Sequence, residues 1–302
     1  MSIVTRREFV RDASMAVTGV ALGNLSRPLA TKPRLAFSTL GCPAWSFANV
    51  LAFAVAHEYL GIELRGLLTE MDLTKCPEFS AANIAATKRS VTDRGLRIVN
   101  LGASTELHEA DARKRRDGLD EGRRYIDLAH QLECPHIRVF PNALPKDRDR
   151  DATFALIGEG LVELSDHAKG SGVDVLMETH GDLVAAADIL RIMQTSAGPN
   201  VGLVWDVCNM WSVTRESPAQ VYAQLHPYIR HTHIKDLTLN GTDVHYVLLG
   251  RGQAPFAEAL RALVAGGYAG YYSFEWEKRW HAELEEPEVA IAHYAKEVVK
   301  YL

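Results

Sequence analysis

The sequence predicts a single α/β barrel in which eight parallel strands alternate with helices. Short runs rich in β-branched, aromatic and aliphatic residues recur along the chain, and longer helix-like segments separate them. No linker, low-complexity tract or shift in composition divides residues 34–302. With 302 residues, 47% of them hydrophobic, the chain is long enough to form one barrel-sized domain with a large core.

Eight runs are expected to form the barrel strands. Strands that are buried on both faces are typically continuous apolar runs, and each of these segments fits that pattern. In chain order they are RLAFSTL (34–40), GIELRG (61–66), LRIVNLG (96–102), HIRVF (136–140), VDVLMET (173–179), VGLVWDV (201–207), IRHTHI (229–234) and YYSFEW (271–276).

Helix signals fill the intervals between these runs. Gly95 is expected to end the helix-like segment 80–95, and Gly170 and Gly172 the segment 153–172, because glycine commonly follows the last turn of a helix. The segment that begins at Ser217 has an N-cap residue followed by Pro218 in the first turn.

An open doubly wound sheet is the alternative architecture. Such a sheet usually has a glycine-rich phosphate turn after its first strand, whereas this chain has Gly41-Cys42-Pro43-Ala44-Trp45 there. The barrel is therefore favoured.

Charge and cysteine content exclude some classes of protein. A formal net charge of -5 gives no electrostatic footprint for a polyanion, so nucleic acid is not expected as a partner. The four cysteines are widely scattered, without the close pairs of a zinc site or the density of a disulfide scaffold. We expect them to be buried as small apolar residues.

The first 30 residues resemble a twin-arginine signal peptide. Thr5-Arg6-Arg7-Glu8-Phe9-Val10-Arg11 is followed by a small-residue apolar stretch, 13–23, that is too short to span a bilayer. The resemblance implies a signal peptide over 1–30, a barrel domain over 31–302, a periplasmic location and no stable membrane anchor.

Four consecutive strand–helix units carry a metal-competent side chain where the strand ends. In a parallel barrel these ends converge on one mouth, where active sites lie. The spacings are about 28, 27 and 42 residues, one unit each, so the four side chains are expected around one point. Three carboxylates and one imidazole suit manganese, magnesium or cobalt better than the thiolate-rich sites of structural zinc. The four residues are Glu178, Asp206, His233 and Glu275.

Six short motifs in this order resemble the sugar phosphate isomerase/epimerase superfamily of xylose isomerase-like TIM barrels, which also includes AP endonuclease family 2. The resemblance covers residues 34–302. The motifs are Gly61-Ile62-Glu63-Leu64-Arg65, Met177-Glu178-Thr179-His180-Gly181, Trp205-Asp206, His233-Ile234-Lys235-Asp236, Leu249-Gly250-Arg251-Gly252, and Gly267-Tyr268-Ala269-Gly270 followed by Ser273-Phe274-Glu275.

The resemblance implies that the four side chains bind one divalent cation, most readily Mn²⁺, with Mg²⁺, Co²⁺ or Zn²⁺ as alternatives. Glu178 and Glu275 would also act as acid and base. His233 is favoured over His231 as the ligand, because the family ligand precedes x-Lys-Asp, and His231 is expected in a supporting position. In many epimerase relatives a histidine follows the aspartate of strand six by three positions. Here that residue is Asn209, whose amide can bind a sugar hydroxyl but cannot shuttle a proton.

Further residues at the mouth are expected to contact a sugar. Trp45 could stack on a sugar face, Glu63 and His180 could bind hydroxyls or orient ligands, and Lys235 could stabilise an enolate oxygen. Arg138 and Arg251 could bind an oxyanion or take part in surface salt bridges. Asp236 is expected to fix Lys235 or to cap a helix.

These residues predict an isomerase or epimerase of a sugar or keto sugar that removes a proton next to a carbonyl through a metal-stabilised enediolate. A metal-dependent lyase or hydratase of 3-keto-glycosides is the alternative, because elimination uses the same metal and base. A sugar-binding protein without turnover and an abasic-site endonuclease are less favoured. Assembly as a homo-oligomer is left open.

Overall fold

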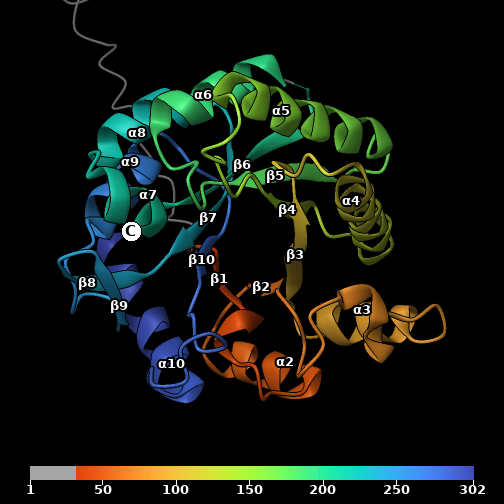
Figure 1. Cartoon of the computed structure of the whole chain (residues 1–302). Helices are drawn as coiled ribbons and strands as arrows, with labels where there is room; N and C mark the ends of the chain where they lie inside the picture. Colours follow the sequence, from red (N-terminus) through yellow and green to blue (C-terminus); the bar gives the residue numbers. More distant parts are fainter. Residues whose placement is uncertain (1–31, 197) are drawn as a thin grey trace, which may run out of the picture. The chain divides into compact units, whose positions relative to one another are not determined.

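The computed structural model describes residues 32–196 and 198–302, and Pro33–Leu302 form one compact unit. The predicted signal peptide lies outside the described residues. Eight parallel strands close into a barrel in the order β1-β10-β7-β6-β5-β4-β3-β2, which confirms the predicted fold class. Figure 1 shows the strands at the centre, with helices around them.

All eight predicted runs contain a barrel strand, and the bounds differ by a few residues. β3 runs four residues further than expected, because Glu106 pairs with Phe140 after a register shift. β10 has only three residues, although the Glu275 amide still donates to the Ile234 carbonyl at 3.3 Å. The strands are β1 (Leu35–Ser38), β2 (Gly61–Leu64), β3 (Arg97–Glu106), β4 (His136–Phe140), β5 (Asp174–Glu178), β6 (Val201–Asp206), β7 (Ile229–Ile234) and β10 (Tyr272–Phe274).

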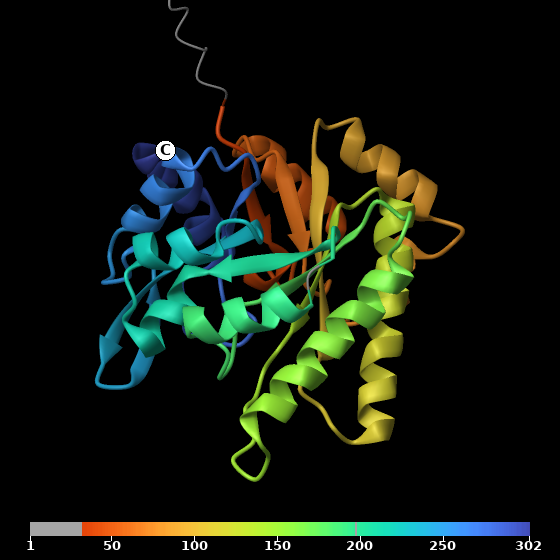
Figure 2. The same cartoon turned by 90° about the horizontal axis from the view of Figure 1, so that it is seen from above.

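The helices begin and end with recognisable signals. Ser217 is the N-cap of α8 with Pro218 in the first turn, and Gly95 and Gly170 have positive φ angles of 71° and 77° after α3 and α5. Figure 2 shows the two longest helices, α4 and α5, side by side. The α-helices described are α2 (Phe47–Ala56), α3 (Ile84–Thr92), α4 (Ala112–Leu132), α5 (Arg150–His167), α6 (Ala186–Thr195), α7 (Val207–Thr214), α8 (Pro218–Leu225), α9 (Phe256–Ala265) and α10 (Pro287–Glu297). Short 3-10 helices occur at Thr39–Gly41, Leu73–Lys75, Pro77–Phe79 and Val298–Tyr301.

A β-hairpin between β7 and α9 was not predicted. β8 (Asp236–Asn240) and β9 (Asp243–Val247) pair in antiparallel register, and Gly241 supplies a positive φ of 64° in the connecting turn. Asn240-Gly241 flanked by residues that alternate between apolar and polar is a known hairpin signal, so the hairpin could have been predicted from the sequence.

The apolar core lies between the strands and the helices, whereas the barrel lumen is largely polar. One strand residue in two, such as Phe37, Ile62 and Val139, belongs to a single buried apolar cluster that includes helix residues. The alternate residues face the lumen, because successive side chains of a strand point to opposite sides of the sheet. The lumen therefore receives buried charged groups such as Glu63 and Glu178.

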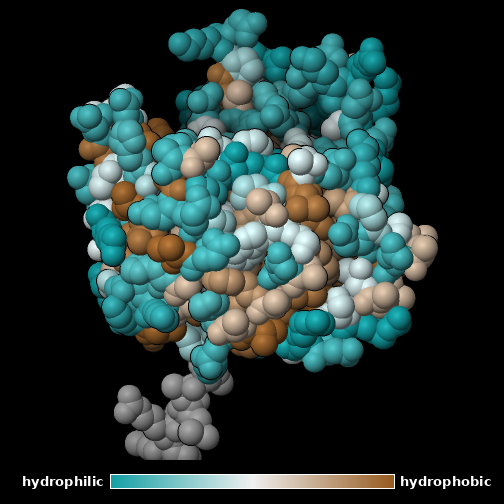
Figure 3. Space-filling model, turned by 90° about the horizontal axis from the view of Figure 1, so that it is seen from below, coloured by the Kyte–Doolittle hydropathy of each residue, from teal (hydrophilic) through white to brown (hydrophobic). Residues whose placement is uncertain are grey.

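The four cysteines are buried and free, as expected. Among residues 32–196 and 198–302, no helix combines the length and apolarity that a membrane span requires. Figure 3 shows apolar side chains gathered on the face that contains α2 and α10. Val55 of α2 and Val289 of α10 are 46% and 52% exposed. Such a face is a candidate contact surface, and the homo-oligomer stays a prediction.

Candidate metal centre

The ends of four strands bring Glu178, Asp206, His233 and Glu275 together. Glu178 and Asp206 are the last residues of β5 and β6, and Glu275 follows β10 directly. The strand register places His233 beside Asp206 on one side and beside Ser273 on the other. All four side chains are buried, and one ligand atom from each lies within 4.8 Å of the others.

The Nδ1 atom of His233 faces all three carboxylates. It lies 3.3 Å from Glu178 Oε1, 3.3 Å from Glu275 Oε1 and 3.8 Å from Asp206 Oδ2. The three oxygens therefore surround one imidazole nitrogen, and Nδ1 is the atom of His233 that could join them as a ligand.

The opposite nitrogen of His233 is held by Glu63. His233 Nε2 lies 3.0 and 3.1 Å from the two Glu63 oxygens, and His231 Nε2 lies 2.6 Å from Glu63 Oε2. A carboxylate on the far nitrogen fixes the orientation and tautomer of a metal-binding histidine. Glu63 therefore lies beneath the centre, bonded to histidines and fully buried.

A buried lysine neutralises part of the carboxylate charge. Lys235 Nζ lies 2.6 Å from Glu275 Oε2, 2.9 Å from Asp206 Oδ2 and 2.7 Å from Glu277 Oε1. Glu277 was not among the predicted site residues. Its position two residues after Glu275 was the available signal, because alternate residues leave a strand on the same side.

Arg138 approaches the centre from β4. Its Nε lies 3.0 Å from Glu178 Oε2, Nη1 donates to the Ala103 carbonyl at 2.8 Å, and the guanidinium lies 3.8 Å from the centre of the Phe140 ring. Among the described residues, neither Arg138 Nε nor Glu178 Oε2 has a partner with hydrogen-bond geometry, so the contact is an ion pair by distance.

Burial and mutual attraction set the charges of this cluster. Burial favours the neutral forms of Glu178 and Glu275. Arg138 and His233 nevertheless bring the pKa of Glu178 below the ordinary range. His233 and Lys235 do the same for the pKa of Glu275. Burial raises the pKa of Asp206 to about 7, and Lys235 offsets this only in part. Burial also opposes the charge on His233, yet the surrounding carboxylates raise its pKa well above the usual value.

The donor set fits a divalent cation that prefers oxygen. Asp206 Oδ2 and Glu178 Oε2 are buried and lack hydrogen-bond partners among the described residues, which leaves lone pairs available inside the cluster. Three carboxylates and one imidazole match Mn²⁺, Mg²⁺ or Co²⁺ better than a thiolate site would. A cation would replace the proton on His233 Nδ1, since a histidine ligand must be neutral.

Asp206 and Asn209 are linked through the start of α7. Asp206 is the N-cap of this helix, and its Oδ1 accepts the Asn209 backbone N–H at 2.8 Å. This bond leaves Oδ2 directed toward Lys235 and His233. Asn209 is partly buried one helical turn from the centre.

His180 lies in a stack on the side of the mouth formed by β4 and β5. Its ring centroid is 4.5 Å from that of Phe140, and Nδ1 lies 2.9 Å from Asn142 Oδ1. Asn142 in turn donates to Glu106 at 2.6 Å. The His180 ring, the Phe140 ring and the Arg138 guanidinium thus form one stacked group.

The structure does not bring Trp45, Arg251 and Asp236 into the centre. The Trp45 indole donates to Glu288 Oε1 at 3.2 Å, and its ring packs on Phe53. Arg251 is exposed and its side chain has no ion-pair partner within the described part of the chain.

Asp236 organises a loop instead of holding Lys235. Its carboxylate accepts the backbone N–H groups of Leu237, Gly250, Gly252 and Ala254 at 2.8–3.1 Å. These bonds tie the beginning of the hairpin to the loop before α9.

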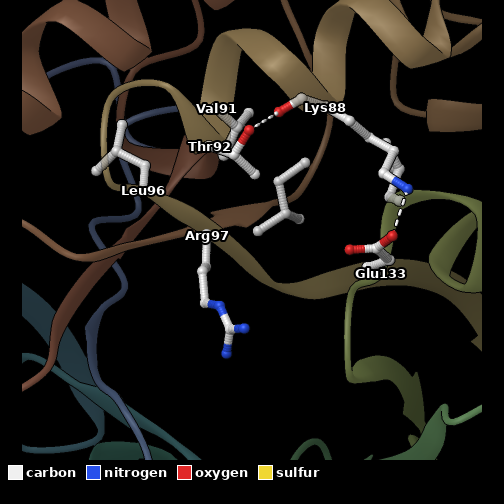
Figure 4. Close-up of a pocket in the computed structure, with 8 residues that line it drawn as sticks. Lys88, Val91, Thr92, Leu96, Arg97 and Glu133 are labelled. Atoms are coloured by element: carbon white, nitrogen blue, oxygen red, sulfur yellow. Dashed lines mark hydrogen bonds and ion pairs between the residues drawn. The ribbon is translucent and has the colours of Figure 1, made fainter.

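A separate small cavity of about 80 Å³ lies at the other end of the barrel, beside the start of β3. Apolar side chains such as Val91, Leu96 and Leu132 line it. Figure 4 shows Lys88 and Glu133 facing each other across one side, with Lys88 Nζ 2.7 Å from Glu133 Oε1. This cavity contains none of the clustered carboxylates.

Comparisons with known proteins agree with this fold. A family model described as a xylose isomerase-like TIM barrel matches residues 51–299. A fructoselysine 3-epimerase from Shigella flexneri is 26% identical over 236 residues, which cover 74% of this chain and 83% of that protein. The prediction of an isomerase- or epimerase-like enzyme agrees with this relative.

Solved structures show the same fold at lower identity. The IolI protein with a bound zinc atom has a TM-score of 0.75 at 18% identity, covering 89% of this chain and 97% of its own. The probable 3-DHS dehydratase AsbF from Bacillus anthracis has a TM-score of 0.72 at 17% identity, with coverages of 88% and 98%.

Proposed function

Because the chain belongs to the xylose isomerase-like TIM barrel family, we propose that it is a divalent-cation-dependent isomerase or epimerase of a keto sugar. One observation carries this proposal: three buried carboxylates surround one histidine nitrogen at the mouth of the barrel. Mn²⁺ is the preferred cation, with Mg²⁺, Co²⁺ and Zn²⁺ as alternatives.

A divalent cation bound here would polarise the substrate carbonyl and make the neighbouring C–H more acidic. The protein supplies the proton-transfer groups. Glu178 and Glu275 come from β5 and β10, which two other strands separate in the barrel, so the two carboxylates approach from different sides. One can remove a proton, and the other, when it carries a proton of its own, can donate that proton to the opposite face, which gives an epimer, or to the next carbon, which gives an isomer.

Asn209 limits the groups that can transfer protons. It occupies the position where many epimerase relatives have a histidine, and an amide does not titrate near neutral pH. We therefore assign both proton transfers to Glu178 and Glu275, and a substrate hydroxyl contact to Asn209.

A lyase of 3-keto-glycosides is the second candidate, and the buried ammonium of Lys235 favours it. Lys235 Nζ lies 2.6 Å from Glu275 Oε2, so a positive charge is held beside the proposed base. Elimination expels an oxygen leaving group, and a fixed cation stabilises the negative charge that develops on it.

The fructoselysine 3-epimerase relative supports a small sugar-derived substrate for this chain. Export remains part of the proposal: residues 1–30 would direct the folded protein to the periplasm through the twin-arginine pathway. A non-phosphorylated substrate fits this location.

The test combines metal analysis with isotope exchange. Purified protein is analysed for Mn²⁺, Mg²⁺, Co²⁺ and Zn²⁺, and is then incubated in heavy water with a panel of keto sugars and 3-keto-glycosides. Deuterium at one carbon next to the carbonyl is the expected result, and product analysis separates epimerisation, isomerisation and elimination. Exchange that continues at an equal rate after chelation would contradict the proposal.

Glu275→Gln tests whether Glu275 is needed as the base. Exchange is expected to fall about 100- to 10,000-fold, because an amide cannot accept the proton. Glu285→Gln, at an exposed position on the following loop, is the control and should exchange at the wild-type rate. Wild-type exchange by Glu275→Gln would remove Glu275 from this role.

A further inference from the structure

Two arginines converge at the mouth on the side of Glu178, and only one of them was expected there. Arg65 directly follows β2, and Arg138 lies in β4. Both are buried, with exposed fractions of 7% and 1%. Buried guanidinium groups are normally matched by carboxylates or other acceptors, so their partners are informative.

Gly102 of β3 allows the two side chains to meet. A Cβ atom at this position would lie 2.6 Å from Arg65 Cδ and 2.9 Å from Arg138 Nη2, closer than side-chain atoms pack. The register pairs Gly102 with Arg138, so both arginine side chains pass beside Gly102.

The guanidinium of Arg65 is only partly satisfied. Nη2 donates to Ser104 Oγ at 3.2 Å, whereas Nη1 is buried and has no hydrogen-bond partner in the described part of the chain. Most buried donors in folded proteins are paired, so an unpaired one at a candidate active site indicates a missing acceptor.

The neighbouring carboxylates do not supply that acceptor. Glu121 accepts the Ser104 amide at 3.0 Å and the Thr105 hydroxyl at 3.4 Å, and Glu178 faces His233 and Arg138. Burial, followed by repulsion from Arg138, lowers the pKa of Arg65 to about 10, which leaves it charged at neutral pH.

We propose that Arg65 and Arg138 bind a carboxylate group of the substrate, which would make the substrate a sugar acid or keto acid. The planar guanidinium fork matches a carboxylate, and the proposed cation lies on the other side of Glu178. This inference rests on the proposed function, because the carboxylate would place the reacting carbonyl beside the same centre.

The test measures binding of matched acid and neutral compounds to the cation-loaded protein by calorimetry. The pairs are D-glucuronate and D-glucose, D-galacturonate and D-galactose, and D-glycerate and glycerol. At least one acid should bind about tenfold or more tightly than its neutral partner, as charge-assisted hydrogen bonds predict. Arg65→Met should reduce this preference to within about twofold.

Controls separate the charge, the geometry and folding. Arg113→Met removes an exposed arginine of α4 and should keep the wild-type preference. Arg65→Lys retains the charge without the planar fork, so this variant should keep only part of the preference for acids. If Arg65→Met does not fold, Arg65→Lys replaces it. Arg138 is left intact because it also contacts Glu178.

The inference is overturned if no acid binds more tightly than its neutral partner, or if Arg65→Met keeps the full preference. Tighter binding of glucose 6-phosphate than of glucuronate would overturn the carboxylate assignment. Cation content is measured on the same samples. Protein that binds a cation without preferring acids contradicts this inference alone, whereas protein that takes up no divalent cation contradicts the proposed function.

Discussion

The pKa values of basic side chains shift in opposite directions at the mouth and at the floor of the barrel lumen. At the mouth, His233 and Lys235 are surrounded by carboxylates that raise their pKa values well above the ordinary range. At the floor, His136 begins β4 and its Nδ1 has no hydrogen-bond partner among the described residues. Burial, together with repulsion from His231, lowers the pKa of His136 to about 3.

This difference shows that burial alone does not decide the charge of a lumen residue. Burial disfavours the charged form at both ends, and only the mouth has enough opposite charge to overcome it. A cation-binding centre is therefore expected where three strand ends place carboxylates together, and a neutral histidine where they do not.

Removing the buried ammonium should have the largest effect on stability. Lys235→Met leaves Asp206, Glu275 and Glu277 without their shared counter-charge, and breaking a buried pair typically lowers the free energy of unfolding by about 3–5 kcal/mol. Lys88→Met removes an exposed pair with Glu133 and should change it by about 1 kcal/mol or less. Denaturant unfolding of the cation-free proteins measures both, and equal losses would show that the mouth charges are not coupled as described.

Weakening the support of His233 should lower the affinity for a cation, an effect of intermediate size. Glu63→Gln removes the carboxylate that holds His233 Nε2, and loss of such a partner typically lowers metal affinity about 10- to 100-fold. Titration with Mn²⁺ measures the change. Glu288→Gln, at the start of α10, is the control, and an unchanged affinity in Glu63→Gln would assign Glu63 to a different role.

The floor should respond to pH and not to the cation. Since the pKa of His136 is about 3 in the folded protein and near 6.5 when unfolded, the unfolded chain binds the extra proton between these values. Stability should therefore fall as pH drops below about 6.5 and be unaffected by this group above it. His136→Asn should lose less stability than wild type between pH 7 and pH 5 in thermal melts, and His226→Asn, exposed at the end of α8, should behave like wild type.

Much of the fold was readable because each strand is a separate apolar run. The eight runs needed no knowledge of partners, and their spacing fixed which side chains end up at the mouth. The same spacing selected Glu178, Asp206, His233 and Glu275, which the structure brings together. Their role as cation ligands remains a prediction.

Contacts between distant elements were not readable in this way. Glu63 was expected to bind substrate hydroxyls or to orient ligands, and which ligand it holds was not readable: it bonds His233, 170 residues away, because the closed barrel places β2 across the lumen from β7. The Lys235–Glu277 contact and the convergence of Arg65 with Arg138 also depend on side-chain reach and on Gly102, which no local pattern shows.

The ring-shaped apolar core separates folding from chemistry. The apolar side chains that drive collapse lie on the outer face of the strands and on the helices, so the residues facing inward are free to vary as long as their charges balance. A barrel of this kind could acquire new substrates through a few substitutions of lumen-facing residues, while the contacts between strands and helices kept the fold stable.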